Sequence, residues 1–367
     1  MDLINDFEVS VRSENTPKDD LNIIVNQPVK NLAFYNKALS PFLKPEYFNR
    51  NPFRLGYYLS FIIGNLVLVY IALSFNLNIL SLCLIGFLMG CLNAGLAFVS
   101  HELSHGSVVK GKSFQDLLVL FSFAPFLISP TYWRFWHNRL HHGNTQYVLK
   151  DPDAFPTMSV YKNSPFLRWV FKWTPGSKML RSYSYFFFWF SFQSFLNQVY
   201  MRFNNKMWNE MNHKKVTIEF SLQIVMLISY LYLVGFSNWI YLFFIPFFVQ
   251  NYILMSYIST NHNLSPLTKV NDPLVNSLSV SNYRLLEFLH LNFGYHVEHH
   301  IFPRMSGAYT KKVHDVLKSQ FSENYQYMPK ALAIKKLYST ARIYKNSTTL
   351  MHPIDRTTYS TIGASSK

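Results

Sequence analysis

The chain has 367 residues, of which 49% are hydrophobic, 18% aromatic and only 14% charged. This balance is too apolar and too aromatic for an ordinary soluble enzyme of the same length. The net charge of +15 is not carried by basic residues interleaved on a soluble module, so it favours contact with anionic lipid and argues against nucleic-acid binding.

The first 53 residues are polar with scattered apolar positions and no apolar h-region, so we expect a cytoplasmic segment without a cleaved signal peptide. Residues 55–100 and 220–268 then contain no Lys, Arg, Asp or Glu. Each tract is long enough for two membrane spans, since about 20 apolar residues cross a bilayer as a helix. We therefore predict two helical hairpins, with spans over residues 55–75, 79–99, 218–236 and 239–258.

The charge distribution predicts how these hairpins are oriented. Neither hairpin turn carries a charge, and every Lys and Arg lies in the N-terminal, middle or C-terminal segment. Positively charged loops stay cytoplasmic, so all three segments and both termini belong on the cytoplasmic side.

Between the hairpins, residues 117–133 are apolar but are broken by Pro125 and Pro130, which indicates a re-entrant or interfacial segment. The aromatic stretch 183–200 is assigned to the membrane surface.

The expected fold is therefore an all-α integral membrane protein with a cytoplasmic, histidine-rich helical cap. We divide the chain into an N-terminal segment (1–53), a membrane catalytic domain (54–310) and a C-terminal helix and tail (311–367), with a frayed end from about residue 348. Cys83 and Cys91 both fall inside the second span and are expected to be small buried side chains. Two cysteines in this position do not build an iron–sulfur cluster.

Nine of the thirteen histidines fall into three groups and one single position, which can converge on the cytoplasmic side. Neighbours within a group recur at i, i+3 or i, i+4, which places their imidazoles on one face of a helix. That spacing suits a shared metal ion, and imidazole is a good ligand for iron, zinc, copper and nickel. The nine are His101, His105, His137, His141, His142, His262, His296, His299 and His300.

Two other metal motifs overlap these groups but explain few of the histidines. His101-Glu102-x-x-His105 has the spacing of a zinc metalloprotease, in which Glu102 would activate water. Glu102-x-x-His105 and Glu287-x-x-His290 match the pairs used by soluble carboxylate-bridged di-iron bundles. The protease would use at most three histidines, and the soluble bundle would leave both His-His pairs unexplained.

Taken together, three groups resemble the histidine boxes of the integral-membrane fatty-acid desaturase and hydroxylase family, over roughly residues 53–303. The boxes are His101-x-x-x-His105, His137-x-x-x-His141-His142 and His296-x-x-His299-His300. The resemblance implies that these eight histidines bind two irons, and His262 is similar to a ninth ligand that some members supply. A hydrogen-bonded, non-ligand role for His262 stays open. Glu102, Glu298 and Asp153, with Asp151 as a further candidate, would accept hydrogen bonds from ligand imidazoles.

The resemblance implies an O2-dependent desaturase that introduces a double bond into a lipid acyl chain, with no catalytic side chain beyond the metal ligands. A hydroxylase or ketolase acting on a lipid or carotenoid would share the same boxes. From other classes, a membrane zinc metalloprotease or a histidine-rich metal transporter remains possible, although a transporter would place ionisable residues at mid-membrane, where these spans have none.

The sequence has no haem or flavin domain and no dinucleotide-binding glycine motif, which implies a separate electron donor of the ferredoxin or cytochrome b5 type. The substrate would be an acyl-lipid or an acyl-thioester, and a bacterial inner membrane is favoured over the endoplasmic reticulum. Four histidines stay outside the pattern. We expect His213, His314 and His352 to face solvent, and His290 to be a core residue or to contact a ligand.

Overall fold

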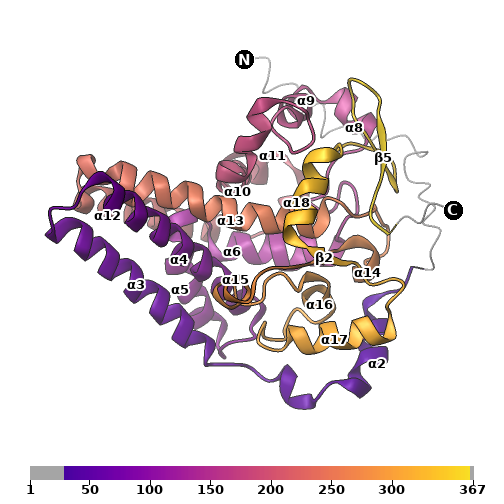
Figure 1. Cartoon of the computed structure of the whole chain (residues 1–367), viewed down its shortest axis with the longest axis horizontal. Coiled ribbons are helices and arrows are strands. Elements are labelled where there is room, and N and C mark those ends of the chain that lie inside the picture. Colours follow the sequence, from indigo (N-terminus) through magenta and orange to yellow (C-terminus); the bar gives the residue numbers. More distant parts are fainter. Residues whose placement is uncertain (1–28, 364–367) are drawn as a thin grey trace.

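Four long apolar helices dominate the computed structural model, which describes residues 29–363. Each is long and apolar enough to cross a bilayer, and together they extend to one side of the rest of the chain (Figure 1). They form two hairpins, which confirms the predicted architecture. The helices are α3 (Arg54–Ser74), α4 (Ile79–His105), α12 (His213–Val234) and α13 (Ile245–His262), the last continuing from the π-helical turn η10 (Ile240–Phe244) after η9 (Phe236–Asn238).

Two of these helices are longer than the sequence predicted. α4 was expected to end near residue 99 and α13 near residue 258, but they continue to His105 and His262. Hydropathy falls where the polar residues begin, whereas the helical hydrogen bonds continue through them. Three candidate metal ligands, His101, His105 and His262, are therefore carried by the extension of a membrane helix.

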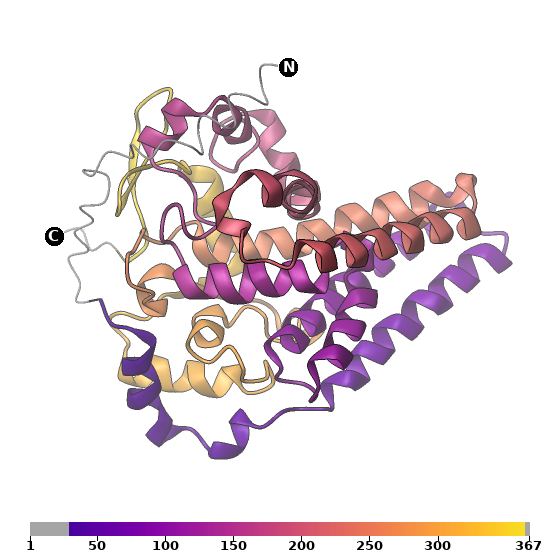
Figure 2. The ribbon, with the colours of Figure 1, turned by 180° about the vertical axis from the view of Figure 1, so that it is seen from behind.

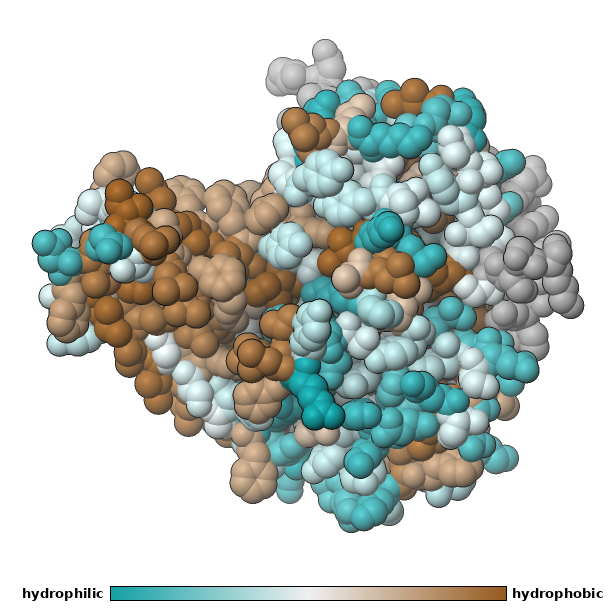
Figure 3. Space-filling view, viewed as in Figure 1, coloured by the Kyte–Doolittle hydropathy of each residue, from teal (hydrophilic) through white to brown (hydrophobic). Residues whose placement is uncertain are grey.

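Each hairpin has an inner and an outer helix. The inner helices α4 and α13 approach closely at Gly86, where a Cβ would lie 2.3 Å from the carbonyl oxygen of Tyr241 just before α13. The outer helices α3 and α12 present exposed apolar side chains, including Leu66 and Leu233. Figure 3 shows this apolar surface gathered over the long helices, with polar surface over the rest of the molecule. The outer helices therefore form the lipid-facing surface of a membrane protein.

The segment between the hairpins is broken at its prolines and returns the chain to the histidine-rich end of the bundle. Side chains of the membrane helices bind its open backbone groups. Gln250 of α13 donates to the carbonyl oxygen of Pro125 at 2.9 Å, and Gln223 of α12 donates to that of Ile128 at 2.8 Å. Hydrocarbon offers no water to these groups, so the polar side chains make a non-helical turn stable at this depth. The segment comprises α5 (Lys112–Ser122), η4 (Ala124–Phe126) and α6 (Pro130–Trp133).

Residues 154–209, which we call the roof layer, form short helices beside the end of α13 that is nearest the cap (Figure 2). Their aromatic helix α10 packs along α13, where the backbone N–H of Ser191 donates to Asn251 at 2.9 Å. The aromatic stretch therefore lies against a membrane helix rather than crossing the bilayer as a fifth long helix. The layer comprises α8 (Met158–Asn163), α9 (Pro165–Phe171), η6 (Leu180–Ser184), α10 (Tyr185–Leu196), η7 (Asn197–Met201), α11 (Arg202–Asn204) and η8 (Lys206–Trp208).

The C-terminal part of the cap is helical with two small sheets. The mostly helical cap agrees with the predicted fold class. The expectation of a frayed tail from residue 348 was wrong for the described residues, because β4 (Thr349–Met351) pairs with both β3 (Tyr344–Asn346) and β5 (Thr358–Ser360) in antiparallel register. β1 (Ser279–Ser281) and β2 (Tyr327–Pro329) form a parallel pair. The helices are α14 (Pro273–Asn276), α15 (Arg284–Leu289), α16 (His296–Ile301), α17 (Thr310–Gln320) and α18 (Lys330–Ser339).

The N-terminal segment packs on this cap. Asp272 accepts hydrogen bonds from the backbone N–H of Lys30 at 2.7 Å and from the hydroxyl of Tyr35 at 2.9 Å. Residues 1–28 of the predicted N-terminal segment and residues 364–367 of the predicted tail lie outside the described residues. The described N-terminal elements are α2 (Leu32–Leu39), η2 (Ser40–Phe42) and η3 (Pro45–Phe48).

Candidate metal centre

The first two histidines lie on the last turns of α4. His101 and His105 are one helical turn apart, and their ring centroids are separated by 4.8 Å. The helix ends directly after them at Gly106, whose φ of 74° belongs to the left-handed region that glycine adopts without strain. The unbroken helix therefore fixes both imidazoles relative to the membrane span.

The second group is carried by a π-helix, η5 (Arg134–His141), followed by α7 (His142–Asn144). The backbone N–H of His142 bonds to the carbonyl oxygen of His137, five residues earlier. In a regular α-helix the i, i+4 spacing would place His137 beside His141, and the geometry differs. The wider π-turn brings His137 together with His142, while His141 joins a different group of ring nitrogens.

The third group lies on the short helix α16 and is divided in a similar way. His296 and His300 are one α-helical turn apart, with 3.1 Å between their Nε2 atoms. His299 instead approaches His142, with 3.1 Å between Nε2 atoms. His262, the last residue of α13, lies 2.7 Å from His296 between Nε2 atoms and so belongs with α16.

The nine histidines form two clusters, and within each the candidate ligand atoms lie within 4.8 Å of one another. In the first, Nε2 of His137 is 2.9 Å from that of His101 and 3.2 Å from that of His142. In the second, Nε2 of His141 is 3.2 Å from that of His262. The five-histidine cluster contains His101, His105, His137, His142 and His299, and the four-histidine cluster contains His141, His262, His296 and His300.

The spacing of these nitrogens fits a shared metal ion in each cluster. A neutral imidazole has one donor and one acceptor nitrogen, so a series of Nε2 atoms that face each other cannot all be hydrogen-bonded. Nitrogen ligands bound at about 2.1 Å and at right angles to each other are about 3 Å apart, which matches the observed separations. Nε2 of His105 is buried and has no hydrogen-bond partner among the described residues. A cation would satisfy all of these lone pairs together.

A small cavity of about 30 Å³ lies between the two clusters. Both clusters border it, and Phe293 contacts a ring of each, with centroids 5.0 Å from His101 and 5.6 Å from His296. A larger, mostly apolar cavity of about 430 Å³ shares Asp153, Ile258 and His262 with the small one. Apolar space of a size typical for ligand pockets therefore reaches the histidine centre.

The inner helices α4 and α13 both border the small cavity. Ala97 of α4 and Leu254 of α13 line it. One helical turn further from the cap, Asn93 donates to Gln250 at 2.8 Å, and both side chains are buried. This hydrogen bond ties the two inner helices together, one helical turn beyond the residues that line the cavity.

Comparison with known proteins identifies the relatives of this chain. Residues 77–331 match the family described as fatty acid desaturase, which is more than half of the sequence. The chain belongs to the fatty acid desaturase family. This membership confirms the resemblance drawn from the three histidine boxes.

Individual relatives of this desaturase-family chain are distant. It is 22% identical over 265 residues to "Omega-6 fatty acid desaturase, chloroplastic" of Spinacia oleracea, a match that covers 68% of this chain and 56% of that protein. It is 23% identical over 262 residues to "sn-1 acyl-lipid omega-3 desaturase (ferredoxin)" of Synechocystis sp., covering 65% of this chain and 68% of that protein. The chain thus spans little more than half the length of the spinach desaturase.

Burial sets the protonation state of the histidines at this desaturase-family centre. It lowers the pKa of His137 and His299 well below the usual value, and the neighbouring imidazoles lower it further. His141 differs, because the charges of Asp151 and Asp153 and a hydrogen bond to Asp151 outweigh burial and raise its pKa. Neutral imidazole is the form that binds metals, and a paired carboxylate increases its basicity.

The aspartates beside His141 were both candidates from the sequence. Oδ1 of Asp151 lies 3.0 Å from Nδ1 of His141, and Oδ2 of Asp153 lies 3.5 Å from the same atom. Asp151 is the closer partner, and it also accepts the backbone N–H of Gln146 at 2.8 Å. Asp153 borders both cavities, and burial raises its pKa to about 7.

The two glutamates have other partners. Glu102 lies 3.2 Å from the guanidinium of Arg54 and accepts from the hydroxyl of Ser306 at 2.8 Å. Among the described residues, no group of closely spaced metal-binding atoms includes Glu102, so it does not sit as a general base beside His101 and His105. Glu298 accepts from Ser279 at 2.5 Å and contacts a histidine outside both clusters. These carboxylates tie the histidine helices to the rest of the cap.

The histidines outside the pattern are mostly buried. His314 and His352 were expected to face solvent, which was wrong, because His314 pairs with Glu298 at 3.1 Å and His352 packs on Phe171. His213 is half-buried at the start of α12. His290 lies in the core, as expected, with Nδ1 2.9 Å from the hydroxyl of Tyr257.

Two contacts to ring nitrogens were missed by the sequence reasoning. Nδ1 of His300 lies 3.3 Å from the hydroxyl of Thr145, and Nδ1 of His262 lies 3.2 Å from the carbonyl oxygen of Asn276. Thr145 follows the second box by three residues, which is a usable signal. A backbone carbonyl leaves no trace in the residue type, so the contact from Asn276 required the structure.

Proposed function

We propose that this protein is an O2-dependent desaturase that introduces a double bond into the acyl chain of a membrane lipid. The observation that carries the proposal is the placing of both histidine clusters around one small cavity that a larger apolar cavity reaches. An unactivated hydrocarbon chain has no polar group near the reacting carbons, so apolar walls must hold it there. The relatives named above act on acyl chains, which agrees with this assignment.

The five-histidine and four-histidine clusters would each hold one iron. Bound iron would supply the O2-dependent oxidising chemistry that breaks an unactivated C–H bond, which no side chain supplies. Family membership favours iron over the other metals that imidazole binds. The carboxylate of Asp151 would orient His141 through its Nδ1–H.

The chain itself would position the substrate and exclude water. The rings of Phe123, Phe190 and Phe293 line the small cavity, and the ring of Trp133 stacks on His137 with centroids 4.6 Å apart. These rigid rings would hold one short stretch of the acyl chain beside the two clusters. The hydrogen-bonded pair Asn93 and Gln250, one helical turn beyond the cavity lining, would limit how far the chain end passes beyond the clusters.

The reaction needs reactants from outside the chain. Two hydrogen atoms leave adjacent carbons, and with one O2, two electrons and two protons they give the alkene and two waters. The name of the Synechocystis relative includes ferredoxin and an acyl-lipid. We propose a separate donor of that type here, with a cytochrome b5-type protein as the other candidate, and an acyl-lipid in preference to an acyl-thioester.

The cap would lie on the cytoplasmic side of the membrane, together with both ends of the chain. This orientation rests on the distribution of Lys and Arg, which avoids both hairpin turns. A bacterial inner membrane remains our preferred location. Residues 54–310 would then form the catalytic membrane domain, with residues 311–367 packed against it.

Lipid analysis of a host that expresses the protein tests the proposed function. We expect a new unsaturated acyl chain with the wild type and none with the His299→Ala, His300→Ala double variant. A hydroxylated or keto product would move the assignment to the hydroxylase alternative. Unchanged lipids together with zinc as the only bound metal would overturn the proposal.

A further inference from the structure

A series of oxidisable aromatic rings starts at the five-histidine cluster. The indole of Trp133 stacks on His137, with ring centroids 4.6 Å apart and an angle of 14° between the planes. The ring of Trp136 follows at 5.5 Å from Trp133, and that of Tyr132 at 5.3 Å from Trp136. Trp208 completes the series, stacked on Tyr132 at 5.5 Å. All four side chains are buried, so indole and phenol rings in mutual contact lead outward from a candidate metal ligand.

The outer end of the series lies just below a polar surface. Trp208 contacts Phe135, with ring centroids 6.0 Å apart, and the guanidinium of Arg139 lies over the same phenylalanine at 5.2 Å. Arg139 pairs with Glu210, and both of these side chains are more than half exposed. A reductant dissolved in water can therefore approach the last ring of the series.

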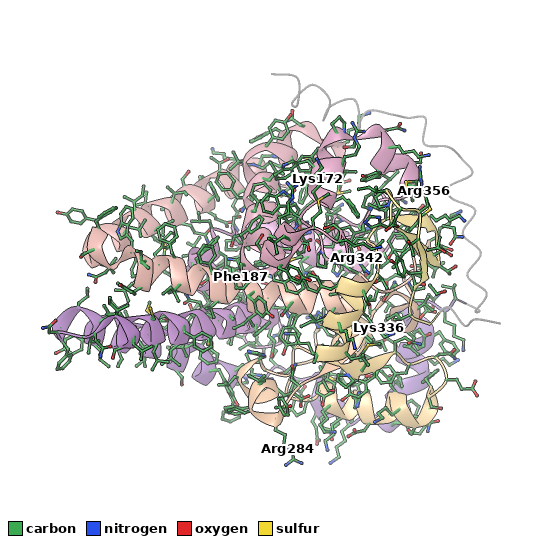
Figure 4. The ribbon with its side chains drawn as sticks, turned by 45° about the horizontal axis from the view of Figure 1, so that its top comes forward. Lys172, Phe187, Arg284, Lys336, Arg342 and Arg356 are labelled. Atoms are coloured by element: carbon green, nitrogen blue, oxygen red, sulfur yellow. The ribbon has the colours of Figure 1, made fainter. Side chains whose placement is uncertain are left out.

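An exposed ring of the roof layer lies nearer the membrane. Figure 4 shows Phe187 of α10 closer to the long membrane helices than Lys172, which follows α9. Exposed phenylalanine suits contact with lipid and is far harder to oxidise than indole or phenol. The series that ends at Trp208 thus leads to water and not to the bilayer.

Packing alone does not explain the indole of Trp133. Its Nε1 is buried and has no hydrogen-bond partner among the described residues. A buried N–H without an acceptor costs free energy, which a phenylalanine in the same place would avoid. The other rings against Trp133 include Phe123 and Phe190, so phenylalanine is used beside it. What indole adds is ease of oxidation, and without an acceptor an oxidised indole keeps its N–H.

We propose that these four rings carry electrons from the aqueous surface to the metal centre when O2 has oxidised it in the absence of an acyl chain. The inference goes beyond the proposed function but rests on its O2 chemistry. The two electrons that the C–H bonds of the substrate would supply come instead from the rings, one at a time. Trp133, Trp136 and Trp208 would each pass through a radical cation, and the ring of Tyr132 bridges the last two of these indoles.

A thiol in solution would refill the series at its outer end. One O2 takes two electrons from the separate donor and two protons from solvent. Two thiols supply the other two electrons and two protons as they join to form a disulfide. The products are two waters and one disulfide, so atoms and charges balance. An indole that is not refilled would react irreversibly beside the histidines, so the series protects the site.

Freeze-quench electron paramagnetic resonance tests this inference without measuring turnover. Iron-loaded protein in a sterol-based detergent, which has no acyl chain, is reduced with dithionite and mixed with O2. We expect an organic radical whose lines narrow when the tryptophans carry deuterium on the indole. Glutathione added after O2 should remove the signal, and an acyl-lipid added before O2 should prevent it.

Trp208→Phe and Trp208→Tyr form a matched pair, because both lose the indole and they differ from each other by one hydroxyl group. In Trp208→Phe the radical should persist after glutathione is added, and peptide mass spectrometry should find hydroxytryptophan at Trp133 and Trp136. Trp208→Tyr keeps an oxidisable ring, so glutathione should again remove the signal. Trp239→Phe, at the turn of the second hairpin, should behave like the wild type.

Three results would overturn the inference: a wild type without a deuterium-sensitive radical, equal removal by glutathione in the wild type and Trp208→Phe, or a Trp239→Phe variant that responds like Trp208→Phe. Lipid analysis separates the inference from the proposed function. A double bond formed without any tryptophan radical would leave the desaturase assignment standing and remove the electron path. A radical that glutathione removes only with an oxidisable ring at position 208, in a protein that gives no unsaturated product, would do the opposite.

Discussion

The two histidine clusters use one ligand type but are held in different ways. In the four-histidine cluster, three imidazoles use their second ring nitrogen to contact the surrounding protein. In the five-histidine cluster we find no hydrogen bond of this kind among the described residues, and the ligand positions depend on the extended helix α4 and the π-turn of η5. One candidate site is therefore oriented by neighbouring polar groups and the other by helix geometry. The oriented imidazoles are His141, His262 and His300.

Removing one imidazole from each cluster gives the largest expected effect. His299→Ala and His300→Ala should each lower product formation by roughly 100-fold or more, because each removes a ligand from a different ion. Iron analysis should show about one iron per chain in each variant, against two in the wild type. His213→Ala, outside both clusters, serves as the control. Full iron content and activity in either cluster variant would contradict the assignment of ligands.

The hydrogen bond to His141 predicts a smaller effect that is confined to the four-histidine cluster. Asp151→Asn keeps the shape of the side chain but removes the charge that raises the pKa of His141. We expect this variant to bind one of its two irons roughly 10- to 100-fold more weakly, as measured by competition with a chelator. Asp315→Asn, an exposed carboxylate paired with Lys311, should leave both irons unaffected. Equal weakening of both irons would remove the distinction between the clusters.

The Asn93–Gln250 pair beyond the cavity between the clusters should determine where the double bond forms. Gln250→Ala removes the contact with Asn93 and lets the chain end move further from the cap. We expect part of the product to carry its double bond roughly one or two carbons away from the wild-type position, because about four side-chain heavy atoms are lost. Mass spectrometry of the lipids measures this shift. Gln223→Ala also removes a side chain that binds the broken segment, but away from the cavity, and should leave the position unchanged.

A still smaller effect is expected from His290, which lies in the core outside both clusters. Burial and the nearby Lys330 lower its pKa to about 3. The unfolded chain takes up a proton at this residue below pH 6.5 and the folded chain does not, so His290 costs stability as the pH falls from about 6.5 towards 3. His290→Gln should reduce the loss of thermal stability between pH 6.5 and 5 by up to about 1.4 kcal/mol per pH unit. If the thermal stability of the wild type and of the His290→Gln variant fell equally between pH 6.5 and 5, His290 would not be buried in its neutral form.

Much of the fold followed from the distribution of charge. Uncharged tracts identified the four spans, and two prolines identified the broken segment between the hairpins. The small strands were not predictable, because each has three residues and shows no alternation long enough to detect. The burial of His314 was missed for another reason. Its sequence surroundings include Lys312 and Asp315, and the partner that makes burial possible, Glu298, comes from a different helix.

The candidate site was predictable as a set of nine histidines but not as two groups. Spacing in the sequence assumed α-helical turns, which would place His137 with His141. A π-turn changes that partnership to His137 with His142, and hydrophobic periodicity does not signal such a turn. The division into five and four imidazoles therefore depends on backbone geometry that residue types do not specify.

Anomalous X-ray diffraction at the iron edge would test the central claim most directly. The account predicts two iron peaks in each chain, one surrounded by the five-histidine cluster and one by the four-histidine cluster. A single peak, or a peak that appears only at the zinc edge and lies beside His101 and His105, would contradict it.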